Sequence, residues 1–394
     1  MPLHKLKVRI SIVNALQRNR THLFILACLA TLTIITRLLL IAKASFIYNF
    51  DSYTYIYKAI DFASRGEIQL SAGMPFVIVL GVFFRIFGST FGAILISRFL
   101  MLLMSTLLVC IIYLFGLKMS TKTFGFFAAL LAIFEPYFFS YSIVPHNDVF
   151  VVAMGLVAFY FAASNTKFRY VLSPVFFYIA VFTRPEVYMI LIVPLLMTSF
   201  LKHLRISSVR DMVSFVFFSS LFVLPSVWVY SIYSAVTRFG LIEKLTLFLQ
   251  PELLNTTLKS AFDFYDSEFL NQAFFALIVL GLVLGFFNLV TQFIGFERNG
   301  KRLFIKKKKH ESIKDVFLSD RVVVAFSLLL MFVLHIVVLT VYGYGYVIVG
   351  GVIEITAASP DRYLILSRLL MSYPLAYTLS IAVRRVYAEI ARKK

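Results

Sequence analysis

The sequence predicts an all-α polytopic membrane protein with about ten transmembrane helices and with both termini in the cytoplasm. Of its 394 residues, 60% are hydrophobic and 17% are aromatic, and the mean hydropathy is +0.89. Apolar runs of about 20 residues, the length that crosses the hydrocarbon core of a bilayer, recur along the chain. Lys and Arg are concentrated in alternate loops between these runs. We therefore expect one integral membrane domain over residues 1–394.

The expected spans follow one another with short polar connections. The first comes after a basic leader of 22 residues and has no small-residue cleavage site, so we expect a retained helix and not a signal peptide. The fifth and sixth, within 170–201, are short and meet at Pro185, which disfavours helix at the residue before it. They form either two short spans or a re-entrant pair. The ten runs cover residues 23–44, 91–116, 123–142, 148–164, 170–183, 186–201, 212–234, 270–294, 322–342 and 364–383.

The distribution of charge predicts the orientation, because loops rich in Lys and Arg stay in the cytoplasm. Six segments hold 26 of the 38 Lys and Arg residues and carry a net charge of +20, whereas the rest of the chain carries −1. The net charge of +19 is therefore a signal of topology, and no nucleic-acid partner is expected. The six segments are 1–21, 117–122, 165–169, 202–211, 295–321 and 384–394.

The predicted orientation determines on which side of the membrane the remaining segments lie. Residues 74–87 are apolar but too short for a span, and counting them as one would invert all later loops. We expect an interfacial helix there, with Arg85 extended toward lipid headgroups. The outer face then carries a first loop at 45–90 that includes this helix, and further loops at 235–269 and 343–363. The basic loop 295–321 lies in the cytoplasm, where it also contacts anionic lipid.

Several other kinds of chemistry are disfavoured. Cys28 and Cys110 both fall inside apolar runs, so a disulfide framework is not expected. The glycines of YGYGYVIVGG lack the strand, GxGxxG pattern and helix of a dinucleotide-binding fold. Nucleotide chemistry is therefore not expected on this chain.

Two acidic residues occupy unusual positions at the predicted outer boundary of the membrane. Asp51 is the first acidic residue of the chain and follows the first span, among Tyr48, Tyr53, Tyr55 and Tyr57. Asp148, in the segment VPHND with His146, opens the fourth span. Carboxylates at this depth are costly unless they are paired or face a wet cavity. The alternatives are a solvated residue beside an aromatic belt for Asp51, and a helix cap for Asp148.

Three arginines lie at the same predicted boundary. Arg98 begins the second span, Arg184 lies in the turn before Pro185, and Arg362 begins the last span. Each could be an interface anchor. Three guanidinium groups that converge would instead suit a phosphate at headgroup depth, because guanidinium holds phosphate with paired hydrogen bonds.

These elements, in this order, resemble a known family. The segments DSYTYIYKAIDFASRGEI, MPFVIVLGVFFRIFG, ISRFLMLLMSTLLVC, FEPYFFSYSIVPHNDVF, AVFTRPE and SPDRYLIL are similar to those of membrane glycosyltransferases of the GT-C fold. The branch is the one related to protein O-mannosyltransferases and lipid A aminoarabinose transferases. The resemblance implies a hexosyl- or pentosyltransferase of the cell membrane. Such an enzyme moves a sugar from a polyprenyl-phosphate, dolichyl or undecaprenyl, to an acceptor with inversion, at an active site on the extracytoplasmic face.

The resemblance also implies roles for particular residues. Asp51 matches the acidic residue of the first outer loop, which is the base or positions the acceptor, and Asp148 matches the second-loop acidic residue. Arg98 matches the arginine that opens the second span, and Arg362 with Tyr363 the late RY pair. Many relatives have two adjacent acidic residues in the first loop, whereas here Ser52 follows Asp51.

The chemistry of the residues agrees with these roles. A carboxylate helps a hydroxyl to attack by removing its proton, and fixed arginines stabilise a leaving phosphate. A divalent metal held by Asp51, His146 and Asp148 is an open alternative. A multi-pass transporter or a lipid flippase is the competing class, although Arg37 and Glu135 are among the few charges within the spans. The acceptor, a glycan, lipid or protein, and the sugar itself are left open.

Overall fold

The structure is a computed structural model, and its described part is a bundle of helices with two β-hairpins. It describes residues 3–43, 50–66, 73–88, 92–164, 168–184, 187–203, 213, 216–223, 255, 268–299, 302–307, 320–342, 344–349, 352–358 and 365–393.

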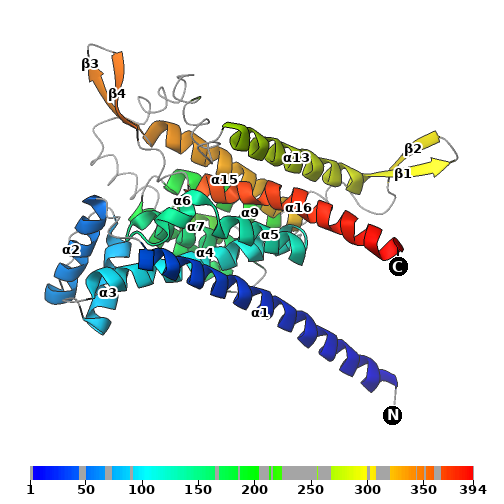
Figure 1. Ribbon diagram of the computed structural model, residues 1–394, viewed down its shortest axis with the longest axis horizontal. Coiled ribbons are helices and arrows are strands. Elements are labelled where there is room, and N and C mark those ends of the chain that lie inside the picture. Colours follow the sequence, from blue (N-terminus) through cyan, green and yellow to red (C-terminus); the bar gives the residue numbers. More distant parts are fainter. Residues whose placement is uncertain are drawn as a thin grey trace.

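Most of the described helices lie over predicted apolar runs, but α1 begins 20 residues before its run and α2 lies in the predicted first outer loop. Their bounds are α1 (Leu3–Lys43), α2 (Phe50–Arg65), α3 (Met74–Phe87), α4 (Ala93–Met119), α5 (Lys122–Ile133), α6 (Pro136–Tyr141), α7 (Asn147–Ala162), α8 (Arg169–Thr183), α9 (Val187–His203), α13 (Glu268–Phe293), α15 (Asp320–Tyr342) and α16 (Ile365–Lys393). In Figure 1, α1 runs along one side of the bundle and α13 along the other, with α4, α5, α7 and α9 between them. The ends of α1 and α16 marked N and C lie at one end of the molecule, and α2 and α3 lie at the other.

Three described stretches are both long and apolar enough to cross a membrane, by length and composition: Arg20–Lys43, Ala93–Met119 and Ile365–Ala391. The other apolar helices of the described part are shorter, so the predicted number of about ten spans stays a prediction. Of the run expected at 212–234, the structure describes only 213 and 216–223, and of the loop at 235–269 only 255, 268 and 269.

The predicted span 123–142 is wrong as one continuous helix. It is divided at Glu135 into α5 and the short α6. Pro136, at the first position of α6, has no N–H to continue the helical ladder, and Glu135 takes an extended conformation before it. Its carboxylate Oε2 accepts a hydrogen bond from the backbone N–H of Phe138 at 2.5 Å and so caps α6.

The prediction of a purely α-helical chain is also incomplete, because two antiparallel hairpins occur in predicted loops. Strands β1 (Ile294–Asn299) and β2 (Arg302–Lys307) pair within the basic loop. Strands β3 (Tyr344–Val349) and β4 (Val352–Ala358) pair in the loop before α16, with a bulge at Gly345 and Tyr346.

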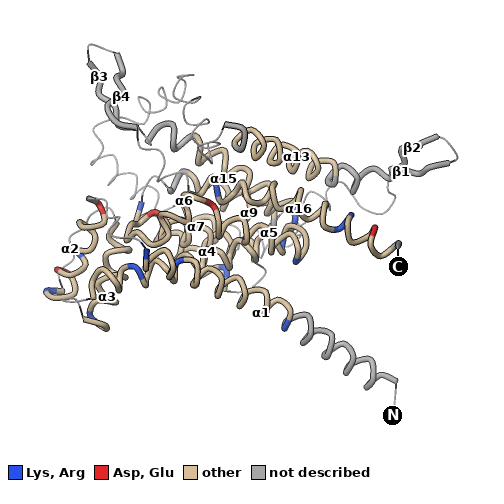
Figure 2. Tube along the Cα trace, viewed as in Figure 1, with Lys and Arg blue, Asp and Glu red and all other residues tan. Residues whose placement is uncertain are grey.

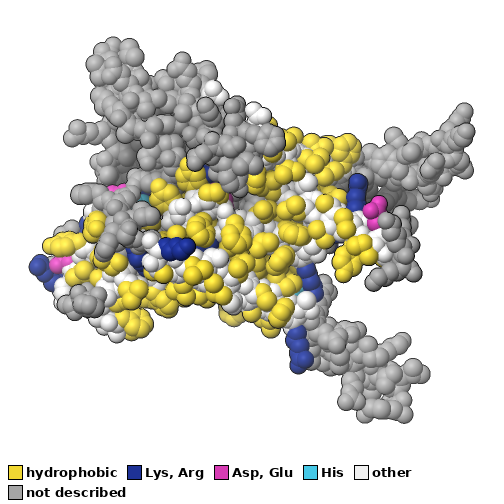
Figure 3. Space-filling view, in the orientation of Figure 1, with side chains coloured by type: hydrophobic (Ala, Val, Ile, Leu, Met, Phe, Trp, Pro, Cys, Tyr) yellow, Lys and Arg dark blue, Asp and Glu magenta, His cyan; other side chains and the backbone are white. Residues whose placement is uncertain are grey.

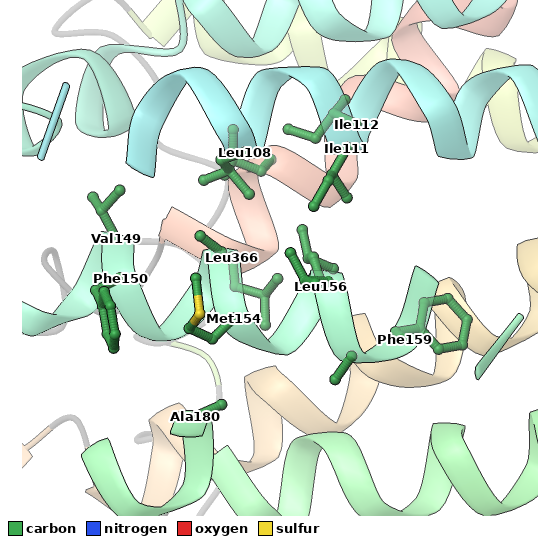
Figure 4. Close-up of a cluster of buried hydrophobic side chains, with 14 of the residues drawn as sticks. Leu108, Ile111, Ile112, Val149, Phe150, Met154, Leu156, Phe159, Ala180 and Leu366 are labelled. Carbon is green, nitrogen blue, oxygen red and sulfur yellow. The ribbon is translucent and has the colours of Figure 1, made fainter. Parts of the chain in front are cut away.

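Helix α7 forms the centre of the core. Most of its residues are buried around the whole circumference, as expected for a helix that is apolar on all sides. Figure 4 shows its side chains between those of α4 and α8, with Leu366 of α16 close by. Helices α4 and α5 approach closely at Gly116 and Gly125, where a Cβ on Gly116 would lie 2.5 Å from the Cα of Gly125. This close packing joins the end of α4 to the start of α5.

The outer surface of the bundle is largely apolar. Exposed large hydrophobic residues include Leu23, Phe24 and Leu39 on α1 and Phe286 and Phe287 on α13. Figure 3 shows hydrophobic side chains over the middle of the visible face, and Figure 2 shows that the charges on α2 and near the C-terminal end of α16 lie toward the ends of the bundle. A surface of this kind suits contact with lipid.

Candidate active site

Four charged or titratable side chains lie in a continuous row at the end of the bundle formed by α2 and α3. Asp51 Oδ2 is 3.4 Å from Nε2 of His146. Nδ1 of His146 is 2.5 Å from Oδ2 of Asp148, and Oδ1 of Asp148 is 2.5 Å from Nη1 of Arg184. Residues that are far apart in sequence, in the predicted first loop, second loop and FTRPE turn, thus meet at one place.

The ends of three helices position these side chains. Asp51 lies in the first turn of α2, and Asp148 lies in the first turn of α7. Both carboxylates therefore lie at the positive end of a helix dipole, which stabilises their charge. Arg184 is the C-cap residue of α8, and its backbone N–H donates to Ala180 O at 2.9 Å.

Asp148 is not a helix cap, so that alternative is wrong. The N-cap of α7 is His146, with an extended backbone and no side-chain capping bond. The carboxylate of Asp148 instead contacts His146 and Arg184. It is thus one member of a buried charge pair, and its negative charge is more important than its capping capacity.

A packed wall of aromatic and small residues supports the row. The Tyr55 ring meets the His146 ring edge to face at 5.6 Å, and the Tyr55 hydroxyl accepts a hydrogen bond from Asn147 Nδ2 at 2.9 Å. Gly73, just before α3, has φ +86° and donates from its N–H to Thr183 O at 3.0 Å. A Cβ at Gly73 would lie 2.5 Å from Tyr55 Cε1. Tyr55 therefore belongs to the site, whereas Tyr53 and Tyr57 are exposed as expected of an aromatic belt.

The row has a buried end and an open end. The side chains of His146 and Asp148 are 3% and 5% exposed, Arg184 is 14% exposed, and Asp51 is 40% exposed. Asp148 is paired with a cation, as a buried carboxylate requires. Asp51 is therefore the carboxylate of this row that a molecule from outside can reach.

The other predicted site residues are Arg98, Arg362 and Tyr363. Arg98 lies half-buried in the second turn of α4, which packs against α2, α3 and α7. Arg362 and Tyr363 lie outside the described residues. The role of all three in binding a phosphate stays a prediction.

Sequence reasoning missed His335. It lies on α15, is buried, and its ring interacts electrostatically with Arg184. A single histidine in an apolar run was the only signal in the sequence.

The described residues do not form a ready metal site. Each ring nitrogen of His146 faces one carboxylate, Nε2 toward Asp51 and Nδ1 toward Asp148. Among the described residues, no group of three or more His, Cys, Asp or Glu side chains is arranged to hold a metal ion.

The described part is a helical bundle with acidic and basic groups gathered at one end. The fold is similar to that of the archaeal oligosaccharyltransferase AglB from Archaeoglobus fulgidus, solved in complex with an inhibitory peptide and a dolichol-phosphate. The TM-score is 0.57 at 12% sequence identity, over 95% of this chain and 52% of that one.

This likeness concerns the fold, because the identity is low. The chain spans about half the length of that oligosaccharyltransferase. No family model matches the sequence, and no curated protein matches it either. The GT-C-like fold expected from the sequence is therefore confirmed, whereas the particular branch named from the motifs stays a prediction.

Proposed function

We propose that the protein is a membrane glycosyltransferase that moves a sugar from a polyprenyl-phosphate donor to an acceptor hydroxyl on the extracytoplasmic side. The observation that carries this proposal is the row from Asp51 through His146 and Asp148 to Arg184. It joins an accessible carboxylate to a buried pair that ends in a guanidinium group. The GT-C-like fold supports the same class of reaction.

Asp51 is the proposed base. An acceptor hydroxyl is a weak nucleophile, and a carboxylate within hydrogen-bond reach removes its proton as the new bond forms. The carboxylate of Asp51 is the exposed end of the row, and its Oδ2 faces His146. His146 lies between Asp148 and this oxygen and orients the carboxylate toward the acceptor.

Arg184, with Arg98, Arg362 and Tyr363, is the proposed contact for the donor phosphate. In a single displacement, the acceptor oxygen bonds to the anomeric carbon on the face opposite the phosphate. The bond from that carbon to the phosphate oxygen breaks, and the polyprenyl phosphate leaves with its electrons. Inversion follows from this geometry. Guanidinium groups stabilise the charge that develops on the leaving phosphate.

The test uses purified protein in lipid vesicles with radiolabelled polyprenyl-phosphate sugars and a membrane extract as the source of acceptors. We expect label to pass from the lipid to a glycan, lipid or protein. Flux of labelled lipid across the vesicle without any transfer would instead establish the flippase or transporter function.

Variants of α2 sharpen this test. Asp51→Asn keeps the shape of the side chain but cannot take a proton, so the transfer rate at saturating donor should fall by about 10²- to 10⁴-fold. Asp61→Asn is the matched control, because Asp61 lies on the same helix and pairs with Arg65 at the surface. It should keep the wild-type rate. An Asp51→Asn protein as fast as wild type would exclude Asp51 as the base.

A further inference from the structure

Two arginine side chains are fully buried, one on the first helix and one on the last described helix of the chain. Arg37 lies on α1, and Arg368 lies on α16. A buried charge in an apolar helix is costly unless its donors are used by other groups. The guanidinium of Arg37 points into the protein and not toward the membrane surface. Both arginines contact the same short stretch, residues 135–142, which we call the α6 segment.

Arg37 contacts the C-terminal end of the α6 segment. Its Nε donates to Ser142 Oγ at 2.9 Å, and its Nη1 donates to Ile133 O at 2.7 Å. The guanidinium also lies over the rings of Phe138 and Phe139, at 5.1 and 4.7 Å from their centroids. A single side chain thus joins the end of α5 to the end of α6.

Arg368 contacts the N-terminal end of the same segment. Its Nη1 lies 3.5 Å from Oε1 of Glu135, the residue that caps α6. Its Cζ lies 3.8 Å from the ring centroid of Tyr137, a cation–π contact. The two arginines therefore hold α6 at opposite ends.

The α6 segment leads directly into the candidate active site. Ser105 of α4 donates to Ser142 O at 3.0 Å, which fixes the backbone at the last residue of the segment. Two tight turns follow, with Val144 N donating to Tyr141 O at 3.2 Å and His146 N donating to Val144 O at 2.7 Å. Because each turn is closed by a hydrogen bond, a shift of Ser142 is passed on to His146.

We propose that Arg37 and Arg368 are positioning residues that clamp the α6 segment and so hold His146 and Asp148 in line with Asp51. The contacts of the two arginines given above are with the α6 segment and the end of α5, and none of these contacts is with the row. A displacement of about 1 Å in a reacting group can reduce a rate by about 10²-fold, so the clamp controls the transfer rate through His146. The inference rests on the proposed function, but the contacts of the clamp do not depend on it.

The first test is a double-mutant cycle in the transfer assay. Ser142→Ala removes the acceptor of Arg37 Nε and leaves the other bonds of the arginine in place. The rate at saturating donor should fall about tenfold, with donor affinity unchanged. In a His146→Ala background, the same Ser142→Ala change should have less than about a twofold further effect, because the residue that it displaces is gone. Additive effects would overturn the clamp.

Thr198→Val is the matched control. Thr198 on α9 makes a buried hydroxyl contact with Ser327 Oγ on α15 at 2.9 Å, away from the α6 segment. The variant also loses a buried bond between helices, so it should lower stability to a similar extent. It should keep the wild-type rate and show no coupling to His146→Ala.

The second test does not need transfer activity. Carbethoxylation of His146 by diethyl pyrocarbonate, followed by mass spectrometry, should be slow in the wild type because the ring is buried. Ser142→Ala and Arg37→Lys should each speed it several-fold, and Thr198→Val should not. Unchanged labelling of His146 in both variants would overturn the clamp. A wild-type protein without transferase activity whose labelling responds in this way would retain the clamp and refute only the proposed function.

Discussion

Nη1 of Arg184 lies 2.5 Å from Oδ1 of Asp148, so the C-cap residue of α8 is joined to the first turn of α7. Asp148 is almost fully buried at this contact. The pair therefore has two functions: it neutralises a carboxylate inside the protein, and it fixes the histidine that the same carboxylate contacts.

Removal of the charge of Asp148 should destabilise the protein. Asp148→Asn leaves the guanidinium of Arg184 without its counter-charge, and breaking one member of a buried pair costs about 3 to 5 kcal/mol. Denaturant unfolding of the protein in detergent measures the loss. Arg184→Gln in the same chain should recover part of it. If Asp148→Asn were neutral, as expected for a simple helix cap, the pair would not contribute to stability.

Substitution of Gly73 should damage the site more than its backbone conformation alone would explain. Gly73→Ala should cost about 1 to 2 kcal/mol for the positive φ, and its Cβ would also push against Tyr55 and, through it, His146. Gly88→Ala is the matched control, since Gly88 has φ +85° but no atom within 4 Å of the added Cβ. We expect backbone strain in both variants, larger in Gly88→Ala because the ψ of 141° at Gly88 lies outside the left-handed helical region that Gly73 occupies with ψ 0°. Transfer should nevertheless fall in Gly73→Ala only. Equal transfer rates in the two variants would show that the packing of Tyr55 against His146 does not contribute to catalysis.

The arginines proposed for the phosphate should differ from lysines in donor affinity. Arg98→Ala and Arg362→Ala should weaken donor binding by about 1 to 3 kcal/mol more than the corresponding Lys variants, because Lys keeps the charge but loses the paired geometry. Arg65→Ala, at an exposed site on α2, is the control and should bind normally. Unchanged affinity in both alanine variants would leave these arginines as anchors at the membrane surface.

The predicted orientation can be tested by labelling of intact cells. In a background with Cys28 and Cys110 replaced by Ala, Leu70→Cys should react with an impermeant thiol reagent and Ile305→Cys should not. The charge of +20 in one set of loops against −1 elsewhere is the reason. Reaction of Ile305→Cys from outside would reverse the orientation and move the candidate site to the cytoplasm.

Much of the architecture could be predicted because apolar run length is a strong signal in membrane proteins. The bounds of α3, α4 and α8 agree with the predicted runs within a few residues. The break at Glu135 was missed because the apolar run continues across it, and only Pro136 indicated a discontinuity. The two hairpins were missed because they lie in segments assigned as loops by charge and hydropathy.

The candidate site could be predicted in part for a similar reason. Asp51, His146, Asp148 and Arg184 were identified because charged residues at the edge of an apolar run are costly and thus conspicuous. Tyr55, Gly73 and His335 were not, because an aromatic residue, a glycine or a lone histidine is common in any helix. Arg368 gave no distinctive signal either, since its partner Glu135 lies far away in sequence and only the fold brings the two together.

The contact between Arg368 and Glu135 also bears on the order in which the protein is made. Every residue of the row lies within the first 184 positions of the chain, whereas Arg368 belongs to α16, the last described helix. A ribosome therefore delivers Asp51, His146, Asp148 and Arg184 to the membrane long before it delivers the arginine that holds the cap of α6. During synthesis, the nascent chain contains all four side chains of the row but only one half of their support, and the second half is added when α16 inserts.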